Sequence, residues 1–206
     1  MSDLLTSKRA SQIFAEDATV NPEKKTVDIL IVVDMQKDFL SGPLGRPEAT
    51  AIIPGIVAKI EEYKAKGGVV IALRDTHEEN YMDTQEAKYL PVVHAIEGTG
   101  GWQLDDAITA ALPEDAILIN KYTFGSLDLV KKIGEYVAKY GQQYVNVEIV
   151  GILTDICVIN NTLLLKAFFY EMPVSLDASC CAAVTPESHK AALLTMTMSQ
   201  VNILNQ

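Results

Sequence analysis

Short runs of β-branched and aliphatic residues recur along the chain from Asp28 onward, each bounded by charge, glycine or proline. Runs of this length and composition are typical of buried strands. The pattern predicts six strands, at residues 29–33, 69–73, 116–119, 147–150, 174–176 and 201–204. Their almost continuous apolar character indicates a sheet that is covered on both faces.

Longer segments with helical spacing of apolar positions separate these runs. They predict helices at residues 49–66, 103–111, 127–140, 156–170 and 186–198. Alternating strands and helices are typical of the α/β class, so we expect a six-stranded parallel sheet in three αβα layers. We assign residues 28–206 to a single domain and residues 1–27 to an N-terminal extension, which has a weak helical pattern at residues 7–16.

The composition limits the possible partners. The 206 residues are 49% hydrophobic and 21% charged, which is typical of a globular domain. Seventeen Lys and Arg against 27 Asp and Glu give a formal charge of −10. This charge repels phosphate backbones and anionic lipid, so we expect no nucleic-acid or membrane partner. The expected ligand is small and neutral or cationic.

Nothing in the sequence directs the chain to a membrane or an oxidising compartment. No apolar run approaches the roughly 20 residues that cross a bilayer, and the N-terminal residues lack the pattern of a secretory signal. The three cysteines are odd in number and two are adjacent, which argues for free thiols. We therefore expect a cytoplasmic protein.

Polar and reactive side chains follow three of the predicted strands. Asp34 comes directly after the first strand, Lys121 after the third, and Cys157 shortly after the fourth. Taken singly, each has a structural explanation: a turn cap, a solvated charge and a small buried hydrophobe. The carboxyl ends of parallel strands share one edge of a sheet, so we expect the three to meet there. Cys157 would then be the nucleophile, Asp34 the base and Lys121 the cation that, with a helix N-terminus, lowers the thiol pKa.

The connection after the second strand is unusually long and holds a second group of residues: Asp75, His77, Glu86 and His94. Two imidazoles and two carboxylates suit Zn²⁺, Mn²⁺ or Fe²⁺ better than Mg²⁺ or Ca²⁺. A solvated acidic loop is the other interpretation of this segment.

Other candidates point to structural roles. Cys180 and Cys181 are expected after the fifth strand, in a small-residue stretch that packs closely, and His189 is expected to be exposed.

The motifs DMQKDF, NKYTFGS and GILTDICV, with Asp34, Lys121 and Cys157, resemble those of the isochorismatase-like cysteine hydrolases. Within that family, RDTHEEN followed by PVVHAIEGTGGWQL is most similar to the metal-binding segment of the nicotinamidases (pyrazinamidases). The resemblance covers residues 28–206.

This resemblance implies the isochorismatase-like fold and a defined reaction. Nicotinamide, and also pyrazinamide, would be hydrolysed through a Cys157 thioester, releasing ammonia and, from nicotinamide, nicotinate. The resemblance implies an oxyanion hole formed by the amides of Leu153 and Cys157, with a cis peptide bond between Leu153 and Thr154. It places Phe39 and Phe124 as aromatic walls of the ring pocket and Leu90 where an aromatic residue is common.

The resemblance also implies a cofactor and a cellular context. Asp75, His77 and His94 match the family's metal ligands, and Glu86 matches a fourth ligand found in some members. Zn²⁺ is the expected ion, with Mn²⁺ or Fe²⁺ as alternatives, and the substrate's ring nitrogen would face it. We expect a homo-oligomer that acts on a small-molecule amide in pyridine nucleotide salvage.

Three alternatives stay open from the sequence. The first is a metal-free amidohydrolase of the same family that acts on a carbamoyl or ureido substrate. In the second, a metal-bound hydroxide performs the hydrolysis and Cys157 is merely buried. The third is a non-catalytic binding protein. Isochorismatase itself is disfavoured because those vinyl-ether hydrolases lack the nucleophilic cysteine.

Overall fold

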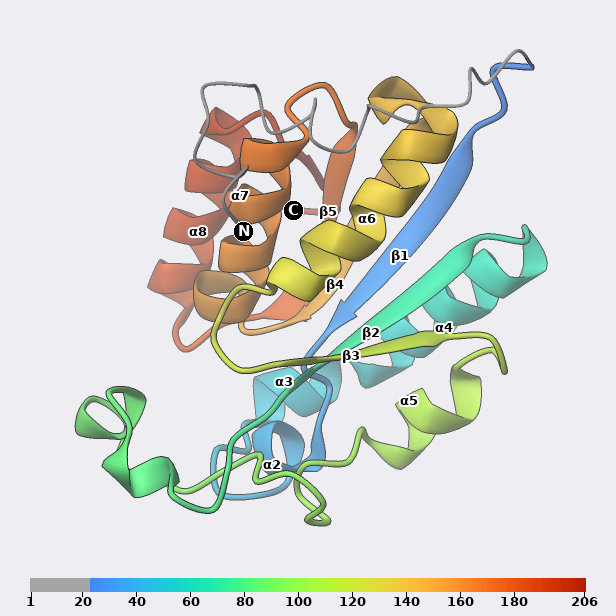
Figure 1. Cartoon of the computed structure of the whole chain (residues 1–206). Helices are drawn as coiled ribbons and strands as arrows, with labels where there is room; N and C mark the ends of the chain where they lie inside the picture. Colours follow the sequence, from blue (N-terminus) through green and yellow to red (C-terminus); the bar gives the residue numbers. More distant parts are fainter. Residues whose placement is uncertain (1–22) are drawn as a thin grey trace, which may run out of the picture.

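Six parallel strands form one sheet in the computed structural model, which describes residues 23–206 (Figure 1). They run in the spatial order β3-β2-β1-β4-β5-β6. Their bounds are β1 Val27–Val33, β2 Val69–Asp75, β3 Ile117–Lys121, β4 Val145–Ile152, β5 Val174–Ala182 and β6 Asn202–Leu204. The predicted six-stranded parallel sheet is confirmed. The weak helical pattern at residues 7–16 lies outside the described residues.

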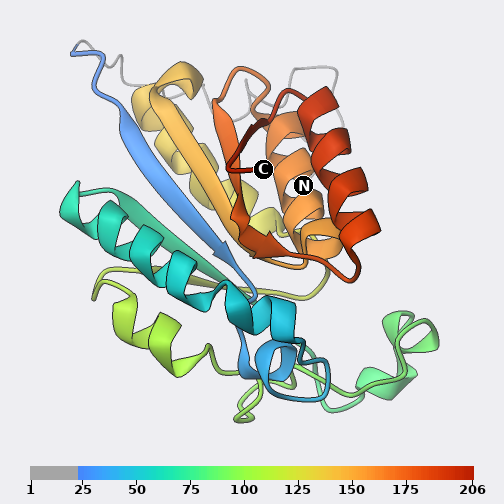
Figure 2. The same cartoon turned by 180° about the vertical axis from the view of Figure 1, so that it is seen from behind.

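Helices cover both faces of this sheet, as predicted. They are α2 Lys37–Leu40, α3 Pro47–Ala51, α4 Ile53–Ala65, α5 Asp106–Ala111, α6 Leu127–Tyr140, α7 Ile159–Phe168 and α8 Pro186–Met198. Helices α6, α7 and α8 pack on one face, and α4 and α5 pack on the other (Figures 1 and 2). Across residues 23–206, no helix combines the length and the hydropathy needed to cross a bilayer.

The alternation of side chains along β1 shows why the sheet needs two covering layers. Ile29, Ile31 and Val33 contribute to the core under α6 and α7. Leu30 and Val32 contribute to the core under α4 and α5. All five are fully buried, so β1 is apolar on both faces, as its uninterrupted sequence indicates.

Two predicted helices begin elsewhere than expected. The segment 49–66 is split into α3 and α4 around Ile52, and Pro54 lies in the first turn of α4. A proline inside one continuous helix would remove a hydrogen bond and clash with the preceding turn, which accounts for the break. The helix predicted from residue 103 starts only at Asp106, where the Asp105 side chain accepts the amide hydrogen of Ala107.

Strand β5 is longer than predicted, and this corrects the placement of two cysteines. Cys180 and Cys181 lie within β5 rather than after it. After a register shift along β4, Gly151 pairs with Cys181. Gly151 has a φ of 118° and approaches the Val33 backbone so closely that no Cβ fits between them. Small residues thus let the ends of β1, β4 and β5 come close together.

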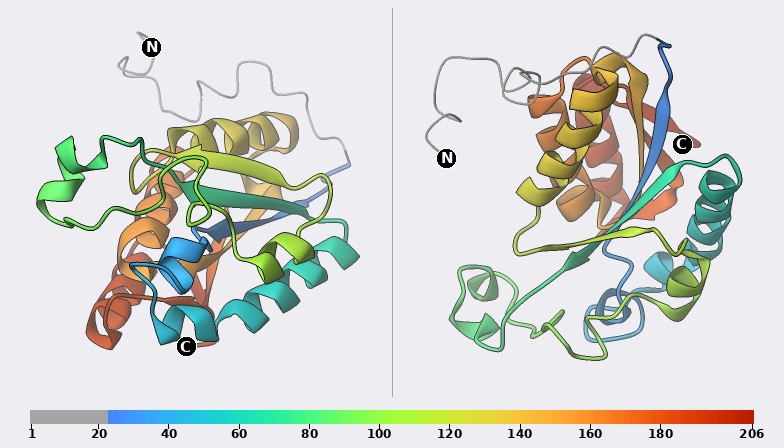
Figure 3. Two further views of the ribbon diagram at one scale, coloured as in Figure 1. Left: turned by 90° about the horizontal axis from the view of Figure 1, so that it is seen from below. Right: turned by 45° about the vertical axis from the view of Figure 1, so that its right-hand side comes forward.

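The strand order creates a crevice at the carboxyl ends of β1 and β4. From β1 the chain moves outward through β2 to β3, then returns to the other side of β1 as β4. Connections leave these two central strands in opposite directions, and ligands bind at such a point in open α/β sheets. The connection from β2 to β3 contains the short helical turns η2 Tyr81–Asp83 and η3 Glu86–Lys88, which project beyond the sheet (Figure 3).

Candidate active site

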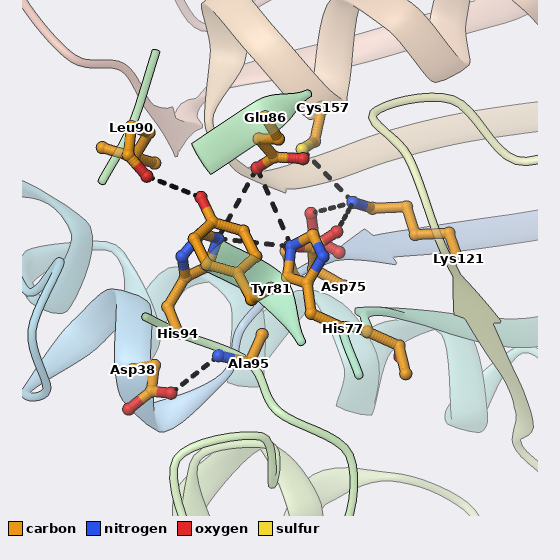
Figure 4. A network of polar contacts seen from close by, with 12 residues as sticks. Asp38, Asp75, His77, Tyr81, Glu86, Leu90, His94, Ala95, Lys121 and Cys157 are labelled. Atoms are coloured by element: carbon orange, nitrogen blue, oxygen red, sulfur yellow. Dashed lines mark hydrogen bonds and ion pairs between the residues drawn. The ribbon is translucent and has the colours of Figure 1, made fainter. Parts of the chain in front are cut away.

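Three side chains from three strand ends meet in the crevice. Lys121 Nζ lies 2.8 Å from Asp34 Oδ2 and donates a hydrogen bond of 3.3 Å to Cys157 Sγ. It also donates to Asp75 Oδ1 at 2.9 Å (Figure 4). All four side chains are buried. The expected meeting of acid, amine and thiol is therefore present in the geometry.

Cys157 is carried by a helical turn, η5 Thr154–Val158, which leads into α7. The predicted helix at 156–170 therefore begins with a wider turn. Asn161 in α7 donates to the carbonyl oxygens of Cys157 and Phe124, at 2.8 and 2.9 Å, and thus ties the turn that carries Cys157 to the segment after β3. The cis peptide bond lies between Ile152 and Leu153, one position before the expected one.

Burial dominates the electrostatics of this group. It raises the pKa of the Asp34 carboxyl to about 6, although Lys121 opposes the rise. It also raises the pKa of the Cys157 thiol well above its ordinary value, again against Lys121. Burial alone would lower the pKa of Lys121, but Asp34, Cys157 and Asp75 hold it well above its ordinary value. The predicted fall of the thiol pKa is wrong, because exclusion of water outweighs the cation. Lys121 is therefore an ammonium ion and Cys157 a neutral thiol at rest.

The second group converges beside the first. One ligand atom from each of Asp75, His77, Glu86 and His94 lies within 4.8 Å of all the others. Nε2 of His77 is buried and has no hydrogen bond of regular geometry to the described residues. Nδ1 of His94 lies 2.7 Å from the Val92 carbonyl oxygen, a contact that places the ring proton on Nδ1 and leaves Nε2 free to coordinate. Two imidazole nitrogens and two carboxylate oxygens fit a divalent ion such as Zn²⁺.

Buried polar contacts fix the backbone that carries these ligands. The Gln36 side chain accepts a hydrogen bond from the Asp75 amide at 2.7 Å and donates to the carbonyls of Asp75 and Trp102. Asp38 Oδ2 accepts from the amide of Ala95, next to His94, at 2.8 Å. The motif that supplies Asp34 therefore also positions two of the candidate metal ligands.

Tyr81 packs against both imidazoles. Its ring centroid lies 4.7 Å from that of His77 and 4.9 Å from that of His94, in edge-on geometry. Its hydroxyl donates to the Leu90 carbonyl at 2.7 Å (Figure 4). Tyr81 thereby holds both histidine rings from the side of the projecting segment.

A cavity of about 190 Å³ opens over these groups. Phe39, Leu90, Phe124, Leu153 and Cys157 all line it, together with Asp34, Asp75, Glu86 and His94. Its volume is below the roughly 300–1,000 Å³ of pockets for drug-sized ligands, so it suits a molecule with a single ring. The residues expected around the ring and the oxyanion therefore share one cavity with the thiol.

The sequence model of the isochorismatase domain matches residues 28–205. This chain belongs to the isochorismatase family. No curated protein matches it by sequence.

Solved structures support the same assignment. A pyrazinamidase of Pyrococcus horikoshii in complex with zinc is 30% identical, with a TM-score of 0.73, over 87% of this chain and 99% of that one. A pyrazinamidase/nicotinamidase from Streptococcus mutans is 24% identical, with a TM-score of 0.73, over 86% and 99%. An N-carbamoylsarcosine amidase from Thermoplasma acidophilum is 22% identical, with a TM-score of 0.67, over 86% and 95%. The last two likenesses support the isochorismatase-family fold.

The structure also shows residues that the sequence analysis gave no role. Gln36 and Asn161 hold the backbone of the site through hydrogen bonds. Tyr81 packs its ring against the two imidazoles. Only Gln36 carried a signal, because it lies within the DMQKDF motif. The expectation that His189 is exposed is wrong: the ring is half-buried and its Nδ1 lies 3.0 Å from Thr154 Oγ1.

Proposed function

We propose that the chain is a nicotinamidase that hydrolyses nicotinamide to nicotinate and ammonia, and accepts pyrazinamide. The observation that carries this proposal is the contact of Lys121 with both Asp34 and Cys157 at the base of a cavity sized for one ring. The group of four side chains that could hold a metal ion at the same cavity favours this proposal over a metal-free ureido amidohydrolase. The 30% identical pyrazinamidase in complex with zinc adds support.

The proposed reaction uses Asp34 alternately as base and acid. Asp34 takes the proton of the Cys157 thiol, and the sulfur forms a bond with the carboxamide carbon. Asp34 returns this proton to the amide nitrogen as the carbon–nitrogen bond breaks, so ammonia leaves and a thioester remains. Asp34 then takes a proton from water, and the water oxygen attacks the thioester. The carbon–sulfur bond breaks, Asp34 returns its proton to the leaving Cys157 sulfur, and the acid product loses its own proton to solvent as nicotinate.

Lys121 and the backbone stabilise the charges that form during these steps. The Lys121 ammonium balances the thiolate when the proton moves to Asp34. The amides of Leu153 and Cys157 are proposed to donate to the oxyanion, and each such donor is worth about 2.7–4 kcal/mol.

Asp75, His77, Glu86 and His94 would hold the divalent ion, with Zn²⁺ as the proposed species. When bound, it supplies an electrophile that can hold a ring nitrogen. The chain's own contribution is to orient the ligands, through Gln36 and Tyr81, and to wall the ring with Phe39 and Phe124.

An ammonia-release assay across nicotinamide, pyrazinamide and an N-carbamoyl amino acid tests the proposal, together with elemental analysis of the purified protein. We expect turnover of the two ring amides and about one divalent ion per chain. A metal-free enzyme that is indifferent to nicotinamide but cleaves the carbamoyl compound would replace this proposal with the ureido alternative.

A further inference from the structure

Arg46 places a cation in the wall of the catalytic cavity. It is the residue before α3, with an extended backbone (φ −141°, ψ 140°) that suits the position before Pro47. The side chain is half-buried and lines the cavity that Cys157 and Asp34 also line. Pro47 restricts the backbone conformation of Arg46 to the extended region.

The guanidinium is anchored by a backbone hydrogen bond, and within the described part of the chain it has no ionic partner. Its Nη1 donates a hydrogen bond of 2.8 Å to the Val184 carbonyl oxygen. Among residues 23–206, no carboxylate lies within ion-pair distance of it. A guanidinium has five N–H donors in a fixed plane, so most of them are left for another group.

The carboxylates of the cavity already face other cationic or basic groups. Asp34 and Asp75 lie 2.8 and 2.9 Å from Lys121. Glu86 Oε1 lies 3.7 Å from Nε2 of His77 and of His94. The Arg46 guanidinium is therefore not paired with any of these acidic side chains of the cavity.

A second hollow, of about 290 Å³, continues from the same point. It shares Arg46 and Val184 with the catalytic cavity and is also lined by Glu48, His189 and Lys190. A ring in the catalytic cavity could thus carry a substituent that reaches past Arg46. The chain's charge of −10 predicts neutral or cationic ligands, but this hollow is lined by two basic side chains, Arg46 and Lys190, and one acidic side chain, Glu48.

We propose that Arg46 is a specificity-determining residue that binds a carboxylate on the substrate, so that the cavity takes ring carboxamides with a second, anionic substituent. The guanidinium fork matches a carboxylate in two parallel hydrogen bonds, and such charge-assisted pairs are roughly twice as strong as neutral ones. This inference rests on the proposed amidohydrolase function and deepens it, because it names the substrate class.

The experiment compares nicotinamides that carry one additional ring carboxylate, as a panel of positional isomers, with their methyl esters. Binding is measured by calorimetry on metal-loaded protein that carries Cys157→Ala, so that the added amides are not hydrolysed during the measurement. We expect the best acid to bind at least about tenfold more tightly than its ester. With Arg46→Met added, the acid and its ester should bind equally well. With Arg46→Lys instead, part of the preference for the acid should remain.

Lys132→Met is the matched control, because it removes one positive charge from α6 at a residue that does not line the cavity, and should leave the ratio unchanged. The ester serves as the reference in each variant, so a general loss of affinity cancels. No preference for any acid, or a preference that persists in Arg46→Met, would overturn the inference. Turnover of plain nicotinamide by the unaltered enzyme tests the proposed function separately.

Discussion

Asp34 occupies a backbone conformation that few residues other than glycine adopt. Its φ is 53°, in the left-handed region that aspartate tolerates better than bulkier residues. The strand ends there, and the carboxylate lies against Lys121 under almost complete burial. One residue therefore combines a sharp turn with an acid whose pKa is raised to about 6.

This raised pKa predicts an acid limb in the pH profile. The carboxylate form is the proposed base, and its fraction falls as pH drops through about 6, so kcat/KM should decrease about tenfold for each pH unit below that value. Initial rates between pH 4 and 8 with a pH-independent coupling system would measure it. Asp34→Asn should be nearly inactive throughout. A full-rate enzyme at pH 4 would contradict the role of Asp34.

Cys157→Ala should lower ammonia release by about 10⁴-fold or more, since it removes the proposed nucleophile. Metal content and thermal unfolding should stay close to those of the unaltered enzyme. Cys180→Ala is a matched control: it also removes a buried thiol, but from β5, outside the lining of the cavity. Equal activities in the two variants would remove the covalent route.

The sequence predicts which residues can meet, because strand ends of a parallel sheet lie at one edge. Asp34, Lys121 and Cys157 follow from that rule alone. The roles of Tyr81 and Asn161 could not be predicted, since they depend on which backbone carbonyl folds against them. The thiol pKa was predicted in the wrong direction because burial depth is a tertiary property.

At the scale of elements, the connection from β2 to β3 depends on contacts made by the segment after β1. Gln36 is fully buried and satisfies three backbone groups there. Asp38 fixes the amide after His94, and its carboxylate fills the space beside Gly101 that a Cβ would need. The long connection is thus held at two points near the candidate metal ligands.

Gln36→Ala should lower the free energy of unfolding by about 2–4 kcal/mol, because it leaves buried backbone groups unpaired. Gln143→Ala, at an exposed position, should change it by less than about 0.5 kcal/mol. Urea denaturation followed by fluorescence measures both. Similar midpoints in the two variants would show that the Gln36 contacts contribute little.

Element boundaries were predicted less well than element types. The split between α3 and α4 follows from Pro54. The spacing of apolar residues, taken alone, continues across this proline and therefore predicted one helix. The extension of β5 to Ala182 could not be anticipated, because its small residues pair only after the register shift beside Gly151. Local pattern specifies a strand, and its neighbours decide where it ends.

At the scale of the whole molecule, a metal ion would tie the β2–β3 connection to the end of the sheet. Saturation at about 100 times Kd stabilises by about 2.7 kcal/mol, so chelation should lower Tm by about 5–10 °C. Differential scanning fluorimetry with and without added Zn²⁺ measures this shift. His94→Ala should abolish the shift, whereas His189→Ala should retain it. An unchanged Tm on chelation of metal-loaded protein would contradict the site.

The sheet order distributes the proposed machinery over separate stretches of chain. Asp34 and Lys121 lie before the turn at Gly141, and Cys157 lies after it, yet β1 and β4 are direct neighbours. A backbone cut at that turn would give two fragments that are each inert, and their complementation would re-form the central strand pair. Hydrolysis would then report reassembly, which makes the protein a candidate split-enzyme sensor.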